Sequence, residues 1–123
     1  MISHVSIGVA DVERSKQFYD LALAPLGYRR VFDGESYMAY GADAAEFWVA
    51  QSESPPAPNA GSGVHFCFDA PDRPAVDAFH AAALAGGGSD NGKPGLRPEY
   101  HPNYYAAFAV DPDGWRIEAY YGG

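Results

Sequence analysis

The chain has 123 residues, a formal net charge of −8 and a pI near 4.7. This length suits one domain with its own core, and the acidic balance argues against nucleic acid or an anionic membrane as a partner, because both require a basic surface. A single cysteine, Cys67, excludes an internal disulfide framework, and the lack of a charged leader or a long apolar run predicts a cytoplasmic protein.

The first half of the sequence predicts a β-α-β-β-β unit. Residues 2–9 alternate between apolar and polar side chains, which is typical of a strand, and Asp11 then stands where a helix cap belongs. Apolar residues at helical spacing predict a helix from about 12 to about 24, ending at Pro25. Three short runs rich in aromatic and β-branched residues follow and predict antiparallel strands: 28–32, 37–40 and 46–50.

The same pattern starts again after residues 51–63, whose Pro-, Ser- and Gly-rich composition is that of a linker. Residues 64–69 alternate as a strand, and Asp72 caps a second helix that ends at the glycines 86–88. The segment 89–103 is rich in glycine and proline and gives a weak signal. Three strands are expected in the remainder of the chain: a short one near 96–100, then 104–110 and 115–121.

The two halves align at an offset of 61 residues, which predicts an internal duplication. The matches include a histidine, a capping aspartate and a phenylalanine: His4 with His65, Asp11 with Asp72, and Phe18 with Phe79. We therefore expect one α+β domain over 1–123, with module 1 at about 1–50 and module 2 at about 64–123. Each sheet should pack its apolar face on its own helix, and the opposite faces should enclose a cupped cavity.

A hairpin turn near the end of the chain, Asp111-Pro-Asp-Gly, joins the last two expected strands. Period-2 alternation then places Arg116, Glu118 and Tyr120 on one face of the final strand. Glu118 stands amid large apolar residues, so its carboxylate must be solvated, paired or bound to a metal.

The duplicated histidines give Glu118 candidate partners. His4 and His65 hold equivalent places on the first strands of the two modules, and Glu118 should neighbour His65 in the sheet. Two imidazoles and one carboxylate suit a divalent ion such as Fe, Mn, Zn, Ni or Co, with positions left for water or a chelating substrate. The alternative is that His4 is an ordinary surface residue and His65 a satisfied, half-buried histidine.

These motifs resemble the vicinal oxygen chelate superfamily, which groups glyoxalase I, extradiol dioxygenases and bleomycin-resistance proteins. The resemblance covers nearly the whole chain and rests on these stretches: 4–11, Ser15, Phe18-Tyr19, 63–66, 111–114 and Ile117-Glu118. It implies paired β-α-β-β-β modules whose curved sheets hold a divalent metal through His4, His65 and Glu118. It also implies a homodimer, in which modules pair either within one chain or between chains.

The resemblance has two gaps. Glyoxalase I-like members supply a second carboxylate from the last strand of module 1, where the alignment here puts Trp48, and Glu46 could replace it only if the register slips. Three ligands without that carboxylate resemble the extradiol dioxygenase set. In those enzymes a histidine and a tyrosine help to handle catechol and oxygen. His101 matches the histidine, and Phe108 stands where the tyrosine belongs.

The leading prediction is a metal-dependent enzyme, glyoxalase-like lyase or isomerase in broad type, acting on a small substrate that chelates the metal through adjacent oxygens. The alternatives are an extradiol ring-cleaving dioxygenase and a metal-free module that sequesters a flat aromatic compound. Candidate catalytic residues are Glu118, His101 and Tyr105. Candidate substrate contacts are an aromatic wall and an arginine for an anionic group: Trp48, Tyr104, Tyr105 and Arg97. Neither the metal nor the substrate is specified by the sequence.

Overall fold

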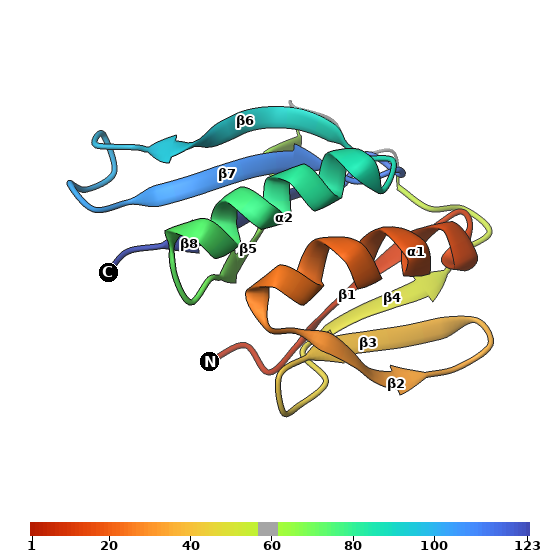
Figure 1. Cartoon of the computed structure of the whole chain (residues 1–123). Coiled ribbons are helices and arrows are strands. Elements are labelled where there is room, and N and C mark those ends of the chain that lie inside the picture. The colour runs from red at the N-terminus through yellow and green to blue at the C-terminus, as the bar shows by residue number, and fades with distance from the viewer. Residues whose placement is uncertain (57–61) are drawn as a thin grey trace.

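Two four-stranded sheets enclose a pair of helices (Figure 1). The computed structural model describes residues 1–56 and 62–123, so the middle of the expected linker lies outside the described residues. The first unit contains β1 (Val5–Val9), α1 (Val12–Leu23), a short 3-10 turn (Ala24–Leu26), β2 (Arg29–Asp33), β3 (Tyr37–Gly41) and β4 (Phe47–Gln51). The second contains β5 (Phe66–Asp69), α2 (Arg73–Ala85), β6 (Ser89–Leu96), β7 (Tyr105–Val110) and β8 (Arg116–Tyr121).

The two units have the same topology, which confirms the predicted α+β fold of repeated β-α-β-β-β units. Their strand orders are β1-β4-β3-β2 and β5-β8-β7-β6. In each sheet the first strand runs parallel to its neighbour, β1 to β4 and β5 to β8, and the other pairs are antiparallel. The first strand of each unit is therefore an edge strand, with one side free of sheet hydrogen bonds.

Both helices begin at the predicted caps. The side chain of Asp11 accepts hydrogen bonds from the backbone N–H groups of Glu13 and Arg14, and that of Asp72 accepts one from Ala75. A cap of this kind stabilises a helix by roughly 1 kcal/mol. Gly27, with a φ of 89°, follows the 3-10 turn and turns the chain into β2. Of the helices in the described residues, none is long and apolar enough to span a membrane.

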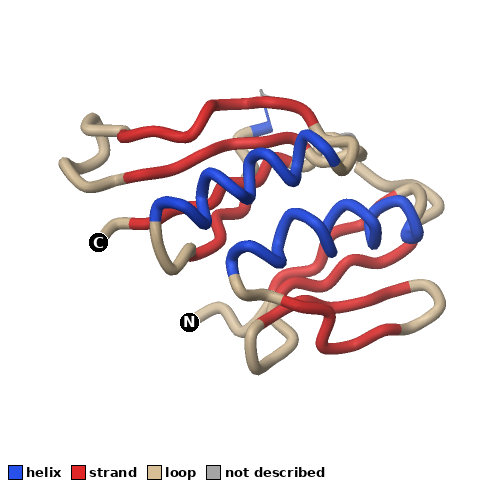
Figure 2. Tube along the Cα trace, in the orientation of Figure 1, coloured by secondary structure: helices blue, strands red, loops and turns tan. Residues whose placement is uncertain are grey.

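The helices pack on each other between the sheets, so the core is shared by both units (Figure 1, Figure 2). Side chains that point inward along each strand are buried against α1 and α2, and their neighbours in sequence point outward. On β4, Trp48 lies between buried Phe47 and Val49. On β8, Glu118 lies between buried Ile117 and Ala119. Trp48 and Glu118 therefore belong to the outer faces of the two sheets, and the helices separate these faces.

The turn at 111–114 is the predicted hairpin, and it also ties the second unit to the first. Asp111 Oδ1 accepts hydrogen bonds from the backbone of Asp113 and Trp115, both at 2.8 Å. Its other oxygen accepts one at 2.6 Å from the hydroxyl of Tyr19, which is fully buried on α1. Trp115 Nε1 donates to the Gly8 carbonyl oxygen at 3.0 Å.

One expected element is wrong. The short strand predicted near 96–100 is instead β6, which covers Ser89–Leu96, and the chain turns after it (Figure 2). The sequence of β6 contains two glycines and a proline, which weaken a strand signal. Pairing with β7 imposes the strand, and its register shifts around Gly92 and Gly95 show how irregular that pairing is.

Candidate functional site

A buried carboxylate forms the centre of the outer face of the sheet β5-β8-β7-β6. Glu118 is 2% exposed, although it points away from the helices. Its Oε1 lies 2.9 Å from Nε2 of His65, and its Oε2 accepts a hydrogen bond at 2.5 Å from the Tyr104 hydroxyl. Both carboxylate oxygens are thus engaged, as burial of a charged group requires.

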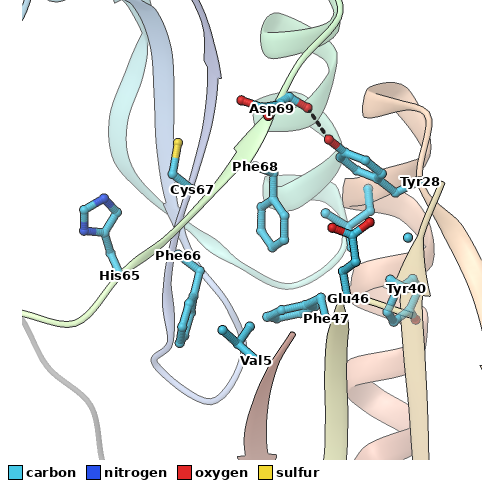
Figure 3. Close-up of a pocket in the computed structure, with 12 residues that line it drawn as sticks. Val5, Tyr28, Tyr40, Glu46, Phe47, His65, Phe66, Cys67, Phe68 and Asp69 are labelled. Atoms are coloured by element: carbon cyan, nitrogen blue, oxygen red, sulfur yellow. Dashed lines mark hydrogen bonds between the residues drawn. The ribbon is translucent and has the colours of Figure 1, made fainter. Parts of the chain in front are cut away.

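Sheet register explains why these side chains meet. β5 and β8 are parallel neighbours, with Phe66 paired with Ile117 and Cys67 with Glu118. His65 comes directly before Phe66, so this register brings it close to Glu118. On the other side of β8, Phe108 of β7 pairs with Glu118. Figure 3 shows that His65 and Cys67 point to one side of β5, away from Phe66 and Phe68. The outer face is therefore assembled from three neighbouring strands and the segments that border them.

The environment keeps the nearby hydroxyl and thiol protonated. Burial and the hydrogen bond to Glu118 raise the pKa of Tyr104 well above its usual range, so the phenol remains a donor. Burial and the charge of Glu118 raise the pKa of Cys67 to about 12. Cys67 is consequently a weak nucleophile at neutral pH.

His101 lies on the same outer face of the sheet, next to Tyr104 and Tyr120. Its Nε2 is 3.0 Å from the Tyr120 hydroxyl, and the rings of Tyr104 and Tyr120 are 4.2 Å apart. His101 also contacts the Tyr104 ring edge-on, at 5.2 Å between centroids. Tyr120 was not among the predicted site residues, although its alternation with Glu118 on the last strand was a usable signal.

Arg97 borders this face. Its Nη1 and Nη2 donate to the carbonyl oxygens of Gly95 and Lys93 at 2.8 and 2.7 Å. The guanidinium lies 5.4 Å from the centroid of the Phe108 ring, within cation–π range. The centroid of the Phe108 ring is in turn 6.4 Å from that of the His65 ring. Phe108 therefore contacts both Arg97 and the His65–Glu118 pair.

His4 and Trp48 lie on the outer face of the other sheet. His4 is exposed, with Nδ1 2.9 Å from the Ser3 hydroxyl and its ring 6.5 Å from Trp48. Trp48 also contacts Phe32 and Tyr37, which stack on each other at 5.4 Å. Phe32 and Tyr37 are 42% and 45% exposed, and neither was among the predicted site residues. We call His4, Phe32, Tyr37 and Trp48 the aromatic face.

Two further candidates lie elsewhere. The Tyr105 hydroxyl donates to Asp77 of α2 at 2.6 Å, so this side chain points to the helix side of the sheet, opposite to Tyr104. Glu46 lines a pocket of about 320 Å³ between the two units, with Tyr28, Tyr40 and Phe47 (Figure 3). The register of β4 is regular, with Trp48 beside Ser6 of β1, so Trp48 keeps the outward position and Glu46 does not replace it.

The model of the Glyoxalase/Bleomycin resistance protein/Dioxygenase superfamily matches residues 1–119. The chain belongs to this superfamily. Among solved structures, a glyoxalase/bleomycin resistance protein from Albidiferax ferrireducens T118 is 36% identical, covers 96% of each chain and has a TM-score of 0.84. A putative glyoxalase from Bacillus halodurans is 26% identical, covers 98% of this chain and 94% of that one, and has a TM-score of 0.70.

A fosfomycin resistance protein, FosX from Mesorhizobium loti, is 19% identical, covers 100% of this chain and 92% of that one, and has a TM-score of 0.72. At that identity the likeness shows the fold alone. No curated protein matches the chain in sequence.

Members of the superfamily commonly use divalent metals, and the His65–Glu118 pair has the donor chemistry for one. An imidazole nitrogen and a carboxylate oxygen 2.9 Å apart share a proton that a metal ion would displace. Across residues 1–56 and 62–123, however, no three histidine, cysteine or acidic side chains are grouped to hold a metal. One chain therefore brings two of the three predicted ligands together, and His4 lies apart from them.

Proposed function

We propose that the protein is a metal-dependent vicinal-oxygen-chelate enzyme, a lyase or isomerase of glyoxalase type in broad terms, whose site is completed by a second copy of the chain. His65 and Glu118 of one copy and His4 of the other would hold the metal. The observation that carries this proposal is the His65–Glu118 pair, 2.9 Å apart at a buried carboxylate on an outer sheet face.

The shared site follows from the positions of the edge strands. His4 comes one residue before β1 and His65 one residue before β5, so they are equivalent in the duplicated fold. The helices keep the two faces apart within a chain. A twofold dimer with β1 of one copy beside β5 of the other would join two edge strands and bring His4 towards the His65–Glu118 pair. Such a dimer contains two equivalent sites.

The residues around the pair have distinct roles in this proposal. A bound divalent metal supplies Lewis acidity that stabilises negative charge on a substrate held through two adjacent oxygens. Tyr104 orients Glu118 by its hydrogen bond to Oε2. His101, next to the Tyr120 hydroxyl, is the candidate group for moving a proton. The partner's aromatic face would cover the substrate and exclude water, and Arg97 would contact the substrate from the edge.

A second candidate function is extradiol ring cleavage. Trp48, which cannot bind a metal, occupies the position of a second carboxylate, so the ligand set would be two histidines and one carboxylate, as in extradiol dioxygenases. The contact between His101 and Tyr104 also favours this function. Phe108 still stands where such enzymes have a tyrosine, and Tyr104 reaches Glu118 from another position. The exposed aromatic face favours a third candidate, the metal-free sequestration of a flat aromatic compound.

Elemental analysis of the purified protein tests the proposal, with Glu118→Gln as the variant and Glu99→Gln as the control. Both changes remove one carboxylate, but Glu99 is exposed in the loop after β6. We expect close to one divalent ion per chain in the wild type and in Glu99→Gln, and a loss of metal in Glu118→Gln.

Zinc, nickel or cobalt with turnover of a hemithioacetal favours the lyase, and iron with oxygen uptake on catechol favours the dioxygenase. A wild type that binds no metal, and whose ligand binding Glu118→Gln leaves unchanged, is a sequestering module.

A further inference from the structure

Arg116 opens β8 on the same outer face as Glu118, two residues before it. Its side chain is half-buried, and its Nε is buried without a hydrogen-bond partner in the part of the chain that the structure describes. A guanidinium is charged at every physiological pH, and a buried donor of a charged group that lacks an acceptor is costly. Such a group calls for an explanation, and a functional role is one of those that apply to buried polar groups.

The register places Arg116 next to the candidate site. Ile117 pairs with Phe66 and Glu118 with Cys67, so the same parallel register brings Arg116 level with His65. On the other side, Arg116 pairs with Val110 of β7. The cation therefore lies at the His65 end of the outer face.

Glu118 lies on the same face, but its oxygens contact His65 and Tyr104, and it forms no ion pair with Arg116 in the described residues. Arginines elsewhere in the described residues show the usual arrangement. Arg14 pairs with Asp113, and Arg30 lies 2.9 Å from both Asp20 and Asp33. Arg116 has no ion pair of this kind in the described residues.

We infer that Arg116 binds a carboxylate of the substrate. The planar guanidinium presents a fork of N–H groups that matches the two oxygens of a carboxylate, and the guanidinium of Arg116 forms no ion pair among the described residues. Its buried Nε adds to the cost of leaving this cation without an anion nearby. Arg97 is less suited to this role, since its Nη1 and Nη2 already donate to backbone carbonyl oxygens.

This inference rests on the proposed function for the location of the site, and it narrows the substrate to a small carboxylic acid that also carries two adjacent oxygens. The chelating oxygens would lie at the His65–Glu118 pair and the carboxylate beside Arg116. A protein with a net charge of −8 repels anions in general, so a local cation is needed to retain one.

The test is calorimetric titration of the purified protein with matched probes. Benzoate and benzyl alcohol differ in charge and need no metal, whereas 2,3-dihydroxybenzoate and catechol differ in charge and also chelate. We expect the wild type to bind each carboxylate at least about tenfold more tightly than its neutral partner. Arg116→Gln should lose this preference and retain its affinity for catechol. Arg116→Lys, which keeps the charge but not the fork, should retain part of the preference. Arg29→Gln removes an exposed arginine of β2 and should match the wild type.

Each outcome decides the inference. An unchanged preference in an Arg116→Gln protein that melts at the wild-type temperature overturns it, and so does a wild type without any preference. Tighter binding of phenylphosphonate than of benzoate also overturns it, because the group recognised is then a phosphonate or phosphate. If metal binds at Glu118 without a carboxylate preference, only this inference fails. If no metal binds, the proposed function fails, and the benzoate titration still decides the role of Arg116.

Discussion

His65 Nε2 lies 2.9 Å from Glu118 Oε1, although the two residues are 53 positions apart in the sequence. The pair forms because β5 and β8 are parallel neighbours and both side chains lie on the same outer face of the sheet. A carboxylate that is 2% exposed on an outer face is unusual, since charged groups on such faces are normally hydrated. A binding site on this outer face would explain why a carboxylate is buried there.

Tyr104→Phe should weaken metal binding by roughly tenfold to a hundredfold, because the hydroxyl that orients Glu118 Oε2 is lost. Tyr105→Phe is the matched control. It removes the same atom from the next residue, whose hydroxyl donates to Asp77 on the helix side of the sheet. Competition with a chelating dye measures both affinities. Equal affinities in the two variants would show that Tyr104 has no part in the metal site.

Trp48→Glu should add a carboxylate to the aromatic face at the position where glyoxalase I-like members supply one. If His4 and the His65–Glu118 pair meet across a dimer, this fourth ligand should raise metal affinity by about tenfold or more. Ala50→Glu serves as the control, since it adds the same charge two residues along β4. Equal metal affinity for the two variants would argue that Trp48 does not face the metal.

Cys67 should react slowly with iodoacetamide at neutral pH although the residue as a whole is exposed, because partial desolvation of its thiol by neighbouring side chains and the charge of Glu118 raise its pKa to about 12. In the metal-free protein the alkylation rate should rise with pH towards that value. Glu118→Gln removes the negative charge, so it should lower the thiol pKa and speed alkylation at a given pH. A rate that is already maximal near pH 9 would contradict this environment for the thiol.

Asp111→Asn should change how the free energy of unfolding depends on pH. Burial raises the pKa of Asp111 above its usual 3.8, against the opposing hydrogen bonds from Tyr19 and from the Asp113 and Trp115 backbone. The folded state therefore keeps this proton at a pH where the unfolded state has lost it. The stability of the wild type relative to Asp111→Asn should fall as pH rises from about 3.8 through the folded-state pKa. Urea unfolding at several pH values checks the sign, and a relative stability that rises over this window would contradict it.

Local chemistry explains which features the sequence could predict. Asp11 and Asp72 cap helices by contacts within three residues, and the turn at 111–114 closes on its own backbone, so these features are encoded locally. The repeat then gave the topology, because equivalent residues perform equivalent roles. β6 was misplaced because its strand conformation comes from pairing with β7 and not from its own composition.

The candidate site was only partly predictable for the same reason. The neighbourhood of His65 and Glu118 follows from strand order in one sheet. The choice between Tyr104 and Tyr105 depends on the register of β7 against β8, which alternation alone does not fix. The separation of His4 from the pair depends on how the two sheets are packed, because the shared helices lie between them. Alternation placed Arg116 on the face of Glu118, but it was not a predicted site residue, because an arginine on an outer face normally contacts solvent or a carboxylate.

The most direct test of the shared site is the metal content of a mixed dimer. Chains carrying His4→Ala and chains carrying Glu118→Gln are co-expressed with different affinity tags and purified as the heterodimer. Each parental homodimer should lack metal, whereas the mixed dimer keeps one intact site, built from His4 of one chain and His65 and Glu118 of the other. We predict about half of the wild-type metal content in the mixed dimer. A mixed dimer with no more metal than its parents, or a His4→Ala homodimer with full metal content, would contradict a site shared between two copies.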